Sequence, residues 1–370
     1  MKKSKTKAKT GLGLKFLFFL NILLACCMVG AYLATHFSPN SIPYLYYLGL
    51  GYPVLLILLL LFTFFWIWYK RKYVLFNIII IGLGWNHLHN FYPVNMFSPA
   101  INSRSVKVLS YNVRIFNLYD KANRFKSRDG IFNFLKKEEA DILCFQEFYH
   151  QENGSDFVTR DSLVKLLALD YYQERYTHKL LDEQYFGVAT FSKYPIINKG
   201  EISFDNDLNN FCIYSDIVKD RDTLRVFNGH IGSIRFQDKD YAFFGDNEAG
   251  KLYQRGPKEQ KILQRLRVAY EKRALQIEKI MVGVVASPYP VIFCSDLNDT
   301  PVSYAYQKVR KQLDDSFVDV GTGVGTTYIG KIPSNRIDYI FHDPKLQAVD
   351  FVTHDIHFSD HKPISVEINL

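Results

Sequence analysis

Two long apolar runs in the first hundred residues constrain this chain more than any other feature. Residues 12–37 are apolar apart from Lys15, Asn21 and a few other polar side chains. Residues 44–69 contain no charged side chain. Each run exceeds the roughly 20 residues that an α-helix needs to cross a bilayer. The sequence therefore predicts membrane spans over about 13–36 and 44–69.

A third apolar segment, residues 73–92, is less uniform because four polar side chains, Asn86, His87, His89 and Asn90, interrupt its end. Residues 73–103 nevertheless contain no Asp, Glu, Lys or Arg, which is unusual for a soluble linker. We therefore expect a third span over about 73–92. The alternative for the first run is a cleaved signal peptide, since it follows a basic start. The second long run argues against a simple secreted protein.

The charge is unevenly distributed along the chain. The net charge is +8, yet the first 103 residues hold nine Lys or Arg and no acidic side chain, so the remainder is close to neutral. The charge therefore does not support a strongly basic surface that tracks DNA, although it leaves room for a local basic patch. The lysine-rich start and residues 70–72 are expected to be cytoplasmic. Three crossings then place everything after residue 100 outside, in an integral protein of the plasma or inner membrane.

The sequence changes character after residue 103, and residues 104–370 are predicted to form one α/β domain. Short apolar runs of strand type alternate with segments of helical spacing at 128–139 and 257–285, and a polar stretch over 235–256 reads as a long loop. The predicted strands are 106–113, 141–147, 186–191, 211–218, 224–228, 291–296, 337–341 and 364–368. None of the five cysteines has the spacing of a zinc site or a disulfide framework.

Many of these strands end in a side chain suited to metal or phosphate chemistry. The strand-end residues are Asn112, Glu147, His230, Asp296 with Asn298, Asp338, and Asp360 with His361. A buried carboxylate is unfavourable unless it is paired or metal-bound. One such residue means little, but repeated placement at strand ends indicates a shared site.

Six of these segments together resemble the endonuclease/exonuclease/phosphatase superfamily, and they occur in the family's order. They are residues 110–113, 145–147, 228–231, 295–299, 336–341 and 359–363. The resemblance implies a four-layer α/β sandwich, in which two packed mixed β-sheets are flanked by helices. In this chain about three transmembrane helices, residues 1–103, would precede it. The implied activity is Mg²⁺- or Mn²⁺-dependent hydrolysis of a phosphodiester or phosphomonoester by in-line attack of water.

The resemblance also implies roles for the metal-side residues. Glu147 is the principal metal ligand, since hard divalent cations take oxygen ligands. Asn112 would support the metal or a phosphate oxygen, and Asp360 is a second metal or water ligand. His361 would contact the scissile phosphate, while Asp338 holds its imidazole in one tautomer.

The remaining implied roles concern the nucleophile and the leaving group. Asp296 is the candidate general base, and Asn298 would donate to the phosphoryl oxygens as charge builds. His230 would contact the phosphate or protonate the leaving group. Glu183 is a tentative orienting partner for His230.

The substrate is less constrained than the chemistry, because this superfamily acts on many phosphoesters. A lipid headgroup, a nucleotide or a nucleic acid are all possible, and the bilayer is the other expected partner. No protein partner follows from the sequence. The main hypothesis is a membrane-anchored phosphoesterase. The alternatives are a membrane-tethered extracytoplasmic nuclease and a non-catalytic membrane protein that binds a phosphorylated ligand.

Overall fold

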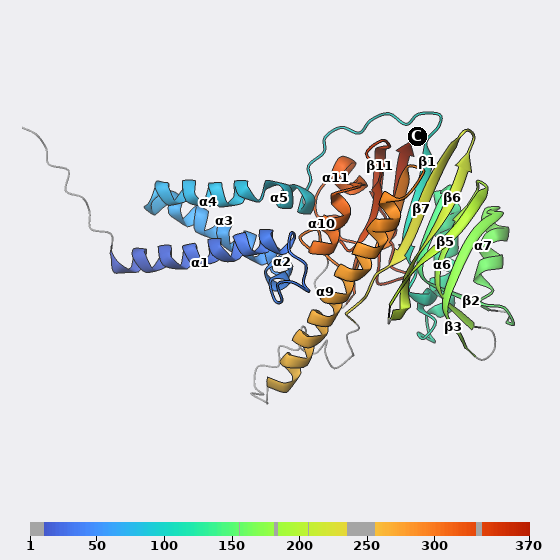
Figure 1. Cartoon of the computed structure of the whole chain (residues 1–370), viewed down its shortest axis with the longest axis horizontal. Helices are drawn as coiled ribbons and strands as arrows, with labels where there is room; N and C mark the ends of the chain where they lie inside the picture. The colour runs from blue at the N-terminus through green and yellow to red at the C-terminus, as the bar shows by residue number, and fades with distance from the viewer. Residues whose placement is uncertain (1–10, 155, 181–183, 206, 235–255, 331–334) are drawn as a thin grey trace, which may run out of the picture.

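The computed structural model describes residues 11–154, 156–180, 184–205, 207–234, 256–330 and 335–370. It has two parts (Figure 1). A group of helices at the N-terminal end lies beside a β-sandwich that the rest of the chain forms. The predicted loop over 235–256 falls almost entirely outside the described residues.

The sandwich consists of two six-stranded sheets. The first has the order β11-β12-β1-β2-β4-β3 and the second the order β5-β6-β7-β8-β10-β9. In the first sheet β1 and β2 are parallel, in the second β7 and β8 are parallel, and all other neighbours are antiparallel. Both sheets are therefore mixed, as expected. The strands are β1 (Val106–Asn112), β2 (Ile142–Gln151), β3 (Tyr171–Leu180), β4 (Gln184–Ser192), β5 (Ile196–Phe204), β6 (Asp207–Lys219), β7 (Asp222–His230), β8 (Val291–Asp296), β9 (Asp314–Asp315), β10 (Asp338–His342), β11 (Gln347–Thr353) and β12 (Ile364–Asn369).

Helices cover both outer faces of the sandwich. An apolar core joins the inner faces of the two sheets, with Val108 from one sheet and Val226 from the other. Ile131 of α6 packs on the outer face of the first sheet, and Ile277 of α9 on that of the second. The predicted four-layer α/β sandwich is confirmed. Its helices are the 3₁₀ turn η1 (Arg114–Asn117), α6 (Arg124–Glu138), α7 (Thr159–Leu167), α9 (Gly256–Val285), α10 (Tyr304–Arg310) and α11 (Ser316–Val320).

The strands that the sequence did not indicate are β3, β5, β9 and β11, which are the four edge strands of the two sheets. An edge strand has one neighbour and more contact with water, so its sequence is less apolar than that of an inner strand. β5, for example, alternates between exposed and partly buried side chains along most of its length. All eight inner strands were predicted, because burial on both sides leaves a continuous apolar run.

The N-terminal part contains two described helices that are long and apolar enough to cross a membrane, α1 (Leu12–Ala34) and α3 (Tyr52–Tyr69). The short helix α2 (Tyr46–Leu50) precedes α3. The predicted third span over 73–92 is not a single helix. It is divided into α4 (Arg71–Leu83) and α5 (Trp85–Phe91), and neither piece is long enough by itself.

The division between α4 and α5 falls at Gly84, which packs against an aromatic ring of α1. A Cβ atom at Gly84 would lie 2.1 Å from the Tyr32 ring. The Tyr32 hydroxyl donates a hydrogen bond to the Ile80 carbonyl at 3.2 Å. The ring therefore occupies the space that a side chain would need at Gly84. Despite the break, α4 runs alongside α1 and α3 (Figure 1).

A buried polar cluster joins these three helices. The Asn21 amide of α1 donates to the Asn77 oxygen of α4 at 2.7 Å, and the Trp66 indole of α3 donates to the Asn21 oxygen at 2.7 Å. All three side chains are fully buried. Polar side chains in an apolar bundle are stable only when hydrogen-bonded, so the cluster specifies the register of the three helices.

Replacing Asn77 by Leu is expected to destabilise the helical part by about 1–2 kcal/mol, because Asn21 loses its amide partner while it stays buried. Thermal unfolding of the full chain in detergent would measure the change. Asn86→Leu is the matched control, since Asn86 lies on α5 with its side chain exposed. An equal loss of stability in both variants would contradict a role for the cluster.

Candidate functional site

The predicted site residues gather at one end of the space between the two sheets. Val108 of β1 points into the core between the sheets, and Asn112 lies on the same face because side chains alternate along a strand. On β8, Ile292 and Cys294 face that core and Asp296 follows on the same face. The site is therefore the polar end of the apolar layer that holds the sheets together.

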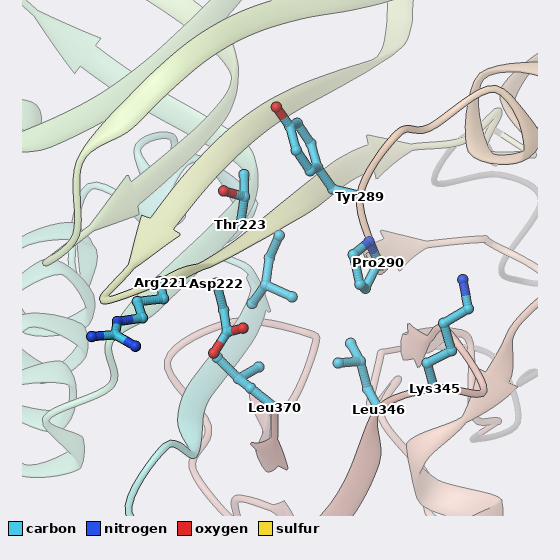
Figure 2. A pocket seen from close by; sticks show the side chains of 9 residues that line it. Arg221, Asp222, Thr223, Tyr289, Pro290, Lys345, Leu346 and Leu370 are labelled. Carbon is cyan, nitrogen blue, oxygen red and sulfur yellow. The ribbon is translucent and has the colours of Figure 1, made fainter.

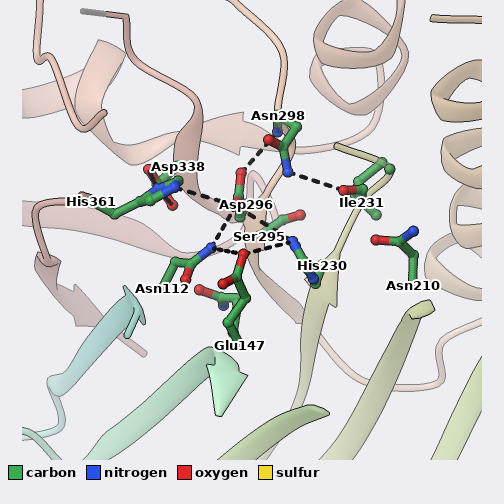
Figure 3. Close-up of polar contacts among 12 residues, drawn as sticks. Asn112, Glu147, Asn210, His230, Ile231, Ser295, Asp296, Asn298, Asp338 and His361 are labelled. Atoms are coloured by element: carbon green, nitrogen blue, oxygen red, sulfur yellow. Dashed lines mark hydrogen bonds and ion pairs between the residues drawn. The ribbon is translucent and has the colours of Figure 1, made fainter. Parts of the chain in front are cut away.

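Asn112 links carboxylates from both sheets (Figure 3). Its amide nitrogen donates to Oδ2 of Asp296 at 2.9 Å and to Oε1 of Glu147 at 3.3 Å. Its oxygen accepts the backbone N–H of Arg114 at 3.0 Å. Asn112 is buried, so this bridge fixes the positions of the two carboxylates relative to one another.

A bulge in β2 turns Glu147 toward this site. The pairing of β2 with β4 shifts register between Phe145 and Phe148, and both of these rings pack in the outer core. Glu147, between them, has a φ of 49° and a side chain that is 36% exposed. A left-handed conformation in a non-glycine residue costs free energy and is often found at functional sites. Because of the bulge, the Glu147 side chain does not pack in the outer core with Phe145 and Phe148. It faces water at the site instead.

His361 and Asp338 form a buried pair. Nδ1 of His361 lies 2.9 Å from Oδ2 of Asp338. Burial would lower the pKa of His361, but the negative charges of Asp338 and Asp296 outweigh burial and raise the pKa to about 10. The imidazole is therefore held in its protonated form with Nε2 directed away from Asp338. The sequence predicted that Asp338 orients the His361 imidazole, and the structure brings the two side chains into hydrogen-bond contact.

Asp296 lies at the centre of the cluster. Its Oδ2 is 3.9 Å from Nε2 of His361 and 3.8 Å from Nε2 of His230. That His230 nitrogen is buried and has no hydrogen-bond partner among the described residues. Asp296 is 1% exposed, and burial together with the charge of Asp338 raises the pKa of its carboxyl group. A carboxylate of raised pKa that faces two imidazoles is suited to accept a proton.

Asn298 joins the same group from the segment after β8. Its backbone N–H donates to Oδ1 of Asp296 at 2.9 Å, and its side-chain amide donates to the Ile231 carbonyl at 3.1 Å. Its φ is 52°, so it is a second site residue in the left-handed region. Asn298 and the residue after His230 are thereby tied together.

Asp360 forms its ion pair outside the group of polar contacts around Asp296. Asp360 lies next to His361 in the chain and forms an ion pair with Arg114, with 3.4 Å between Nε and Oδ2. Burial raises the pKa of its carboxyl group. Glu183, the tentative partner of His230, lies outside the described residues.

Gln146 and Asn228 lie in two of the six family-like segments, and they have a role that the sequence analysis did not assign. The Gln146 amide donates to the Asn228 oxygen at 2.8 Å, and the Asn228 amide donates to the Phe145 and Ala189 carbonyls at 3.2 and 3.0 Å. Both side chains are buried between the sheets. They hydrogen-bond the sheets together directly behind the site. A polar residue on the inward face of an apolar strand was the signal in the sequence.

Two groups of side chains could hold a divalent cation. Asp296, Asp338 and His361 are buried, and their potential ligand atoms lie within 4.8 Å of one another, but this group could take an ion only with His361 deprotonated. Glu147 presents a partly exposed carboxylate at the same site, next to Asn112. Carboxylate and amide oxygens are the ligands that Mg²⁺ and Mn²⁺ prefer, so the donor set fits such an ion.

A pocket of about 380 Å³ lies at the opposite ends of β7 and β8 (Figure 2). It is lined by residues before and at the start of these strands, among them Arg221, Asp222 and Tyr289, and by the C-terminal Leu370. None of the predicted site residues lines it, so it is separate from the cluster around Asp296.

Residues 109–361 match the sequence profile of the Endonuclease/Exonuclease/phosphatase family, over more than half of the chain. The chain belongs to this family. Members of the Endonuclease/Exonuclease/phosphatase family are hydrolases that act on phosphoester bonds, and they generally use divalent metals. Residues 14–91 match a separate profile, described as a domain of unknown function (DUF8431). No curated protein matches the chain.

Solved structures of the Endonuclease/Exonuclease/phosphatase family share the fold of the sandwich. A protein from Beutenbergia cavernae DSM 12333 is 17% identical over 72% of each chain, with a TM-score of 0.53. A protein from Bacteroides vulgatus is 17% identical over 72% of this chain and 99% of its own, with a TM-score of 0.52. TDP2 of D. rerio, humanized by 14 mutations, is 16% identical over 72% of this chain and 100% of its own, with a TM-score of 0.51.

Proposed function

We propose that this protein is a membrane-anchored phosphoesterase that hydrolyses a phosphodiester or phosphomonoester with the help of Mg²⁺ or Mn²⁺. The observation that carries the proposal is the convergence on Asp296 of side chains from both sheets. Asn112, His230 and His361 come from three different strands or loops, yet each places a nitrogen within 3.9 Å of one Asp296 oxygen. Buried carboxylates, imidazoles and an amide that lie this close together are typical of a catalytic site.

The metal would be held mainly by Glu147, with Asn112 and Asp360 as further oxygen donors. When bound, the ion supplies positive charge that stabilises the charge developing on the phosphoryl oxygens. For Asn112 to offer its oxygen, the amide would have to exchange its present contact with the Arg114 backbone. The Glu147 side chain is 36% exposed at the site, so a hydrated ion could reach its carboxylate. This exposure supports Glu147 as the principal ligand.

The protein groups supply the remaining chemistry. Asp296 would take a proton from the attacking water, and such assistance is worth about 10²–10⁴-fold in rate. His361, held protonated by Asp338, would donate to a phosphoryl oxygen, and Asn298 would donate to the same group. His230 would contact the phosphate or protonate the leaving oxygen. Its buried Nε2, which has no hydrogen-bond partner in the part of the chain that the structure describes, supports this role, since a substrate oxygen would satisfy it.

The exposure of α1 and α3 supports the membrane anchor. Only 28% of the residues in the most apolar window of α1, and 17% in that of α3, are buried within the protein. Apolar helices left uncovered in this way need an apolar surrounding, which a bilayer provides. α4 and α5 together would complete a third crossing, because the polar cluster at Asn77 holds α4 against the other two helices.

The charges at the ends of these helices support the proposed orientation. The start of α1 and the connection between α3 and α4, with Lys70 and Arg71, lie at the end farthest from the sandwich (Figure 1). Positive residues favour the cytoplasmic side. We therefore place the sandwich, residues 104–370, on the extracytoplasmic side.

The test offers the full chain in detergent four substrates, each with Mg²⁺ and with EDTA: bis(p-nitrophenyl) phosphate, p-nitrophenyl phosphate, supercoiled plasmid and the phospholipids of added vesicles. We expect Mg²⁺-dependent release of nitrophenol from at least one ester. Cleavage of plasmid with a steep salt dependence would instead support the alternative, a membrane-tethered extracytoplasmic nuclease. Hydrolysis of neither ester and no cleavage of plasmid or of phospholipid vesicles would overturn the proposed activity and support a binding protein.

A further inference from the structure

The helical unit, which we define as α1 to α5, packs on the segment that follows Asp296. Val302 is buried in the same apolar cluster as Met28, Ala31 and Tyr52 of the helical unit. A Cβ atom at Gly49 of α2 would lie 2.6 Å from the backbone oxygen of Val302. Here the backbones of the two parts touch, and no side chain lies between them. This contact is four positions along the chain from Asn298.

A second contact reaches the segment that leads to Asp338. The Arg336 guanidinium is buried and donates to the backbone carbonyl of Asn90, at the end of α5, with 2.5 Å between Nη2 and O. Asp338, which holds His361, follows two residues after Arg336. The helical unit therefore supports the segment that follows Asp296 and the segment that leads to Asp338.

A tyrosine ties these two segments to one another. The Tyr339 hydroxyl donates to the Arg336 carbonyl at 2.7 Å and lies 2.9 Å from the Asp299 carbonyl. Tyr339 is itself buried. A shift of either segment would be transmitted to the other, since both backbone carbonyls contact the same buried hydroxyl.

We propose that the helical unit positions the active site in addition to anchoring it. The packing of α2 and α5 on the sandwich would fix the positions of Asn298 and Asp338 relative to Asp296. The turnover number would therefore depend on this interface. The proposal rests on the proposed phosphoesterase function. Gly49 and Val302 are positioning residues in this scheme, because neither touches the reacting atoms.

The first test replaces Gly49 by Ala in the full chain in detergent, with turnover of the best nitrophenyl ester as the readout. The new Cβ would force the Val302 backbone or α2 to move. A displacement near 1 Å at a catalytic group can cost on the order of 100-fold, so we expect kcat to fall about 10- to 100-fold with KM within about twofold. Gly82→Ala is the control, because a Cβ at Gly82 meets nothing within 4 Å.

The second test separates positioning from a general loss of packing. Val302→Ala and Val309→Ala remove the same two methyl groups from buried sites, but Val309 lies on α10 in the core of the sandwich. We expect both variants to lose thermal stability and only Val302→Ala to lose kcat. A higher substrate concentration is not expected to restore the turnover of Gly49→Ala, since substrate binding should be unchanged.

The outcomes distinguish this inference from the function on which it rests. An inactive wild-type chain would overturn both. An active wild-type chain would overturn the inference alone if folded Gly49→Ala kept its full kcat. The same conclusion would follow if the two valine variants lowered kcat equally.

Discussion

Replacing Asp296 by Asn is expected to lower kcat by about 10²–10⁴-fold, because an amide cannot accept the proton of the attacking water. The change preserves size, and the Asn oxygen can keep one of the two hydrogen bonds that Asp296 receives, from the Asn112 amide or from the Asn298 N–H. Loss of the other bond and removal of a buried charge near Asp338 act in opposite directions, so the free energy of unfolding should change by no more than about 1–2 kcal/mol. The measurement is ester hydrolysis by the full chain in Mg²⁺, with thermal unfolding as a check of folding.

Asp350→Asn is the matched control for this variant. Asp350 is an exposed residue of the edge strand β11, so the same chemical change there should leave kcat unchanged. If Asp296→Asn kept more than about a tenth of the wild-type kcat, the assignment of Asp296 as general base would be wrong, since such a group typically contributes at least about 10²-fold.

Replacing Arg336 by Met is expected to cause the largest loss of stability. Arg336 pairs with Asp315, and neither side chain is more than 2% exposed. Without the guanidinium, the Asp315 carboxylate stays buried and loses its ion-pair partner, which costs about 3–5 kcal/mol. In a domain of this size the melting temperature should fall on the order of 10 °C. Thermal unfolding of the full chain in detergent would measure the shift.

A double variant tests the cause of that loss. Arg336→Met combined with Asp315→Asn should recover much of the stability, because the Asn oxygen can still accept the Phe317 N–H while its NH2 group donates to the Tyr306 hydroxyl. Arg267→Met is the exposed control, since Arg267 pairs with Glu271 on the surface of α9 and such pairs contribute about 1 kcal/mol or less. Equal shifts for Arg336→Met and Arg267→Met would contradict an effect of buried charge.

Much of the sandwich could be predicted from the sequence because its inner strands are buried on both faces. β8, for instance, is apolar along its length until Ser295 and Asp296. The edge strands were missed for the opposite reason. β3 carries Glu174, Arg175 and Lys179, side chains that a strand with a free edge tolerates and that hide its apolar positions.

The site residues could be predicted because chemistry at a shared site places polar groups at the ends of apolar strands. Their mutual geometry could not, because it depends on pairing between strands far apart in the chain. Nothing local indicates that Asn112 bridges Glu147 and Asp296, or that a bulge turns Glu147 out of the outer core. Simple alternation along β2 would instead place the Glu147 side chain on the same face as Phe145, in the outer core.

By itself the sequence determined the apolar runs of α1 and α3, the inner strands and the order of the six polar segments, because these depend on local composition and spacing. Only the tertiary structure decided that the third apolar segment breaks at Gly84, where the Tyr32 ring of another helix fills the space. It alone brought Gly49 against Val302 and Asn90 against Arg336. Contacts of this kind arise from packing between distant segments, and no local pattern encodes which surfaces will meet.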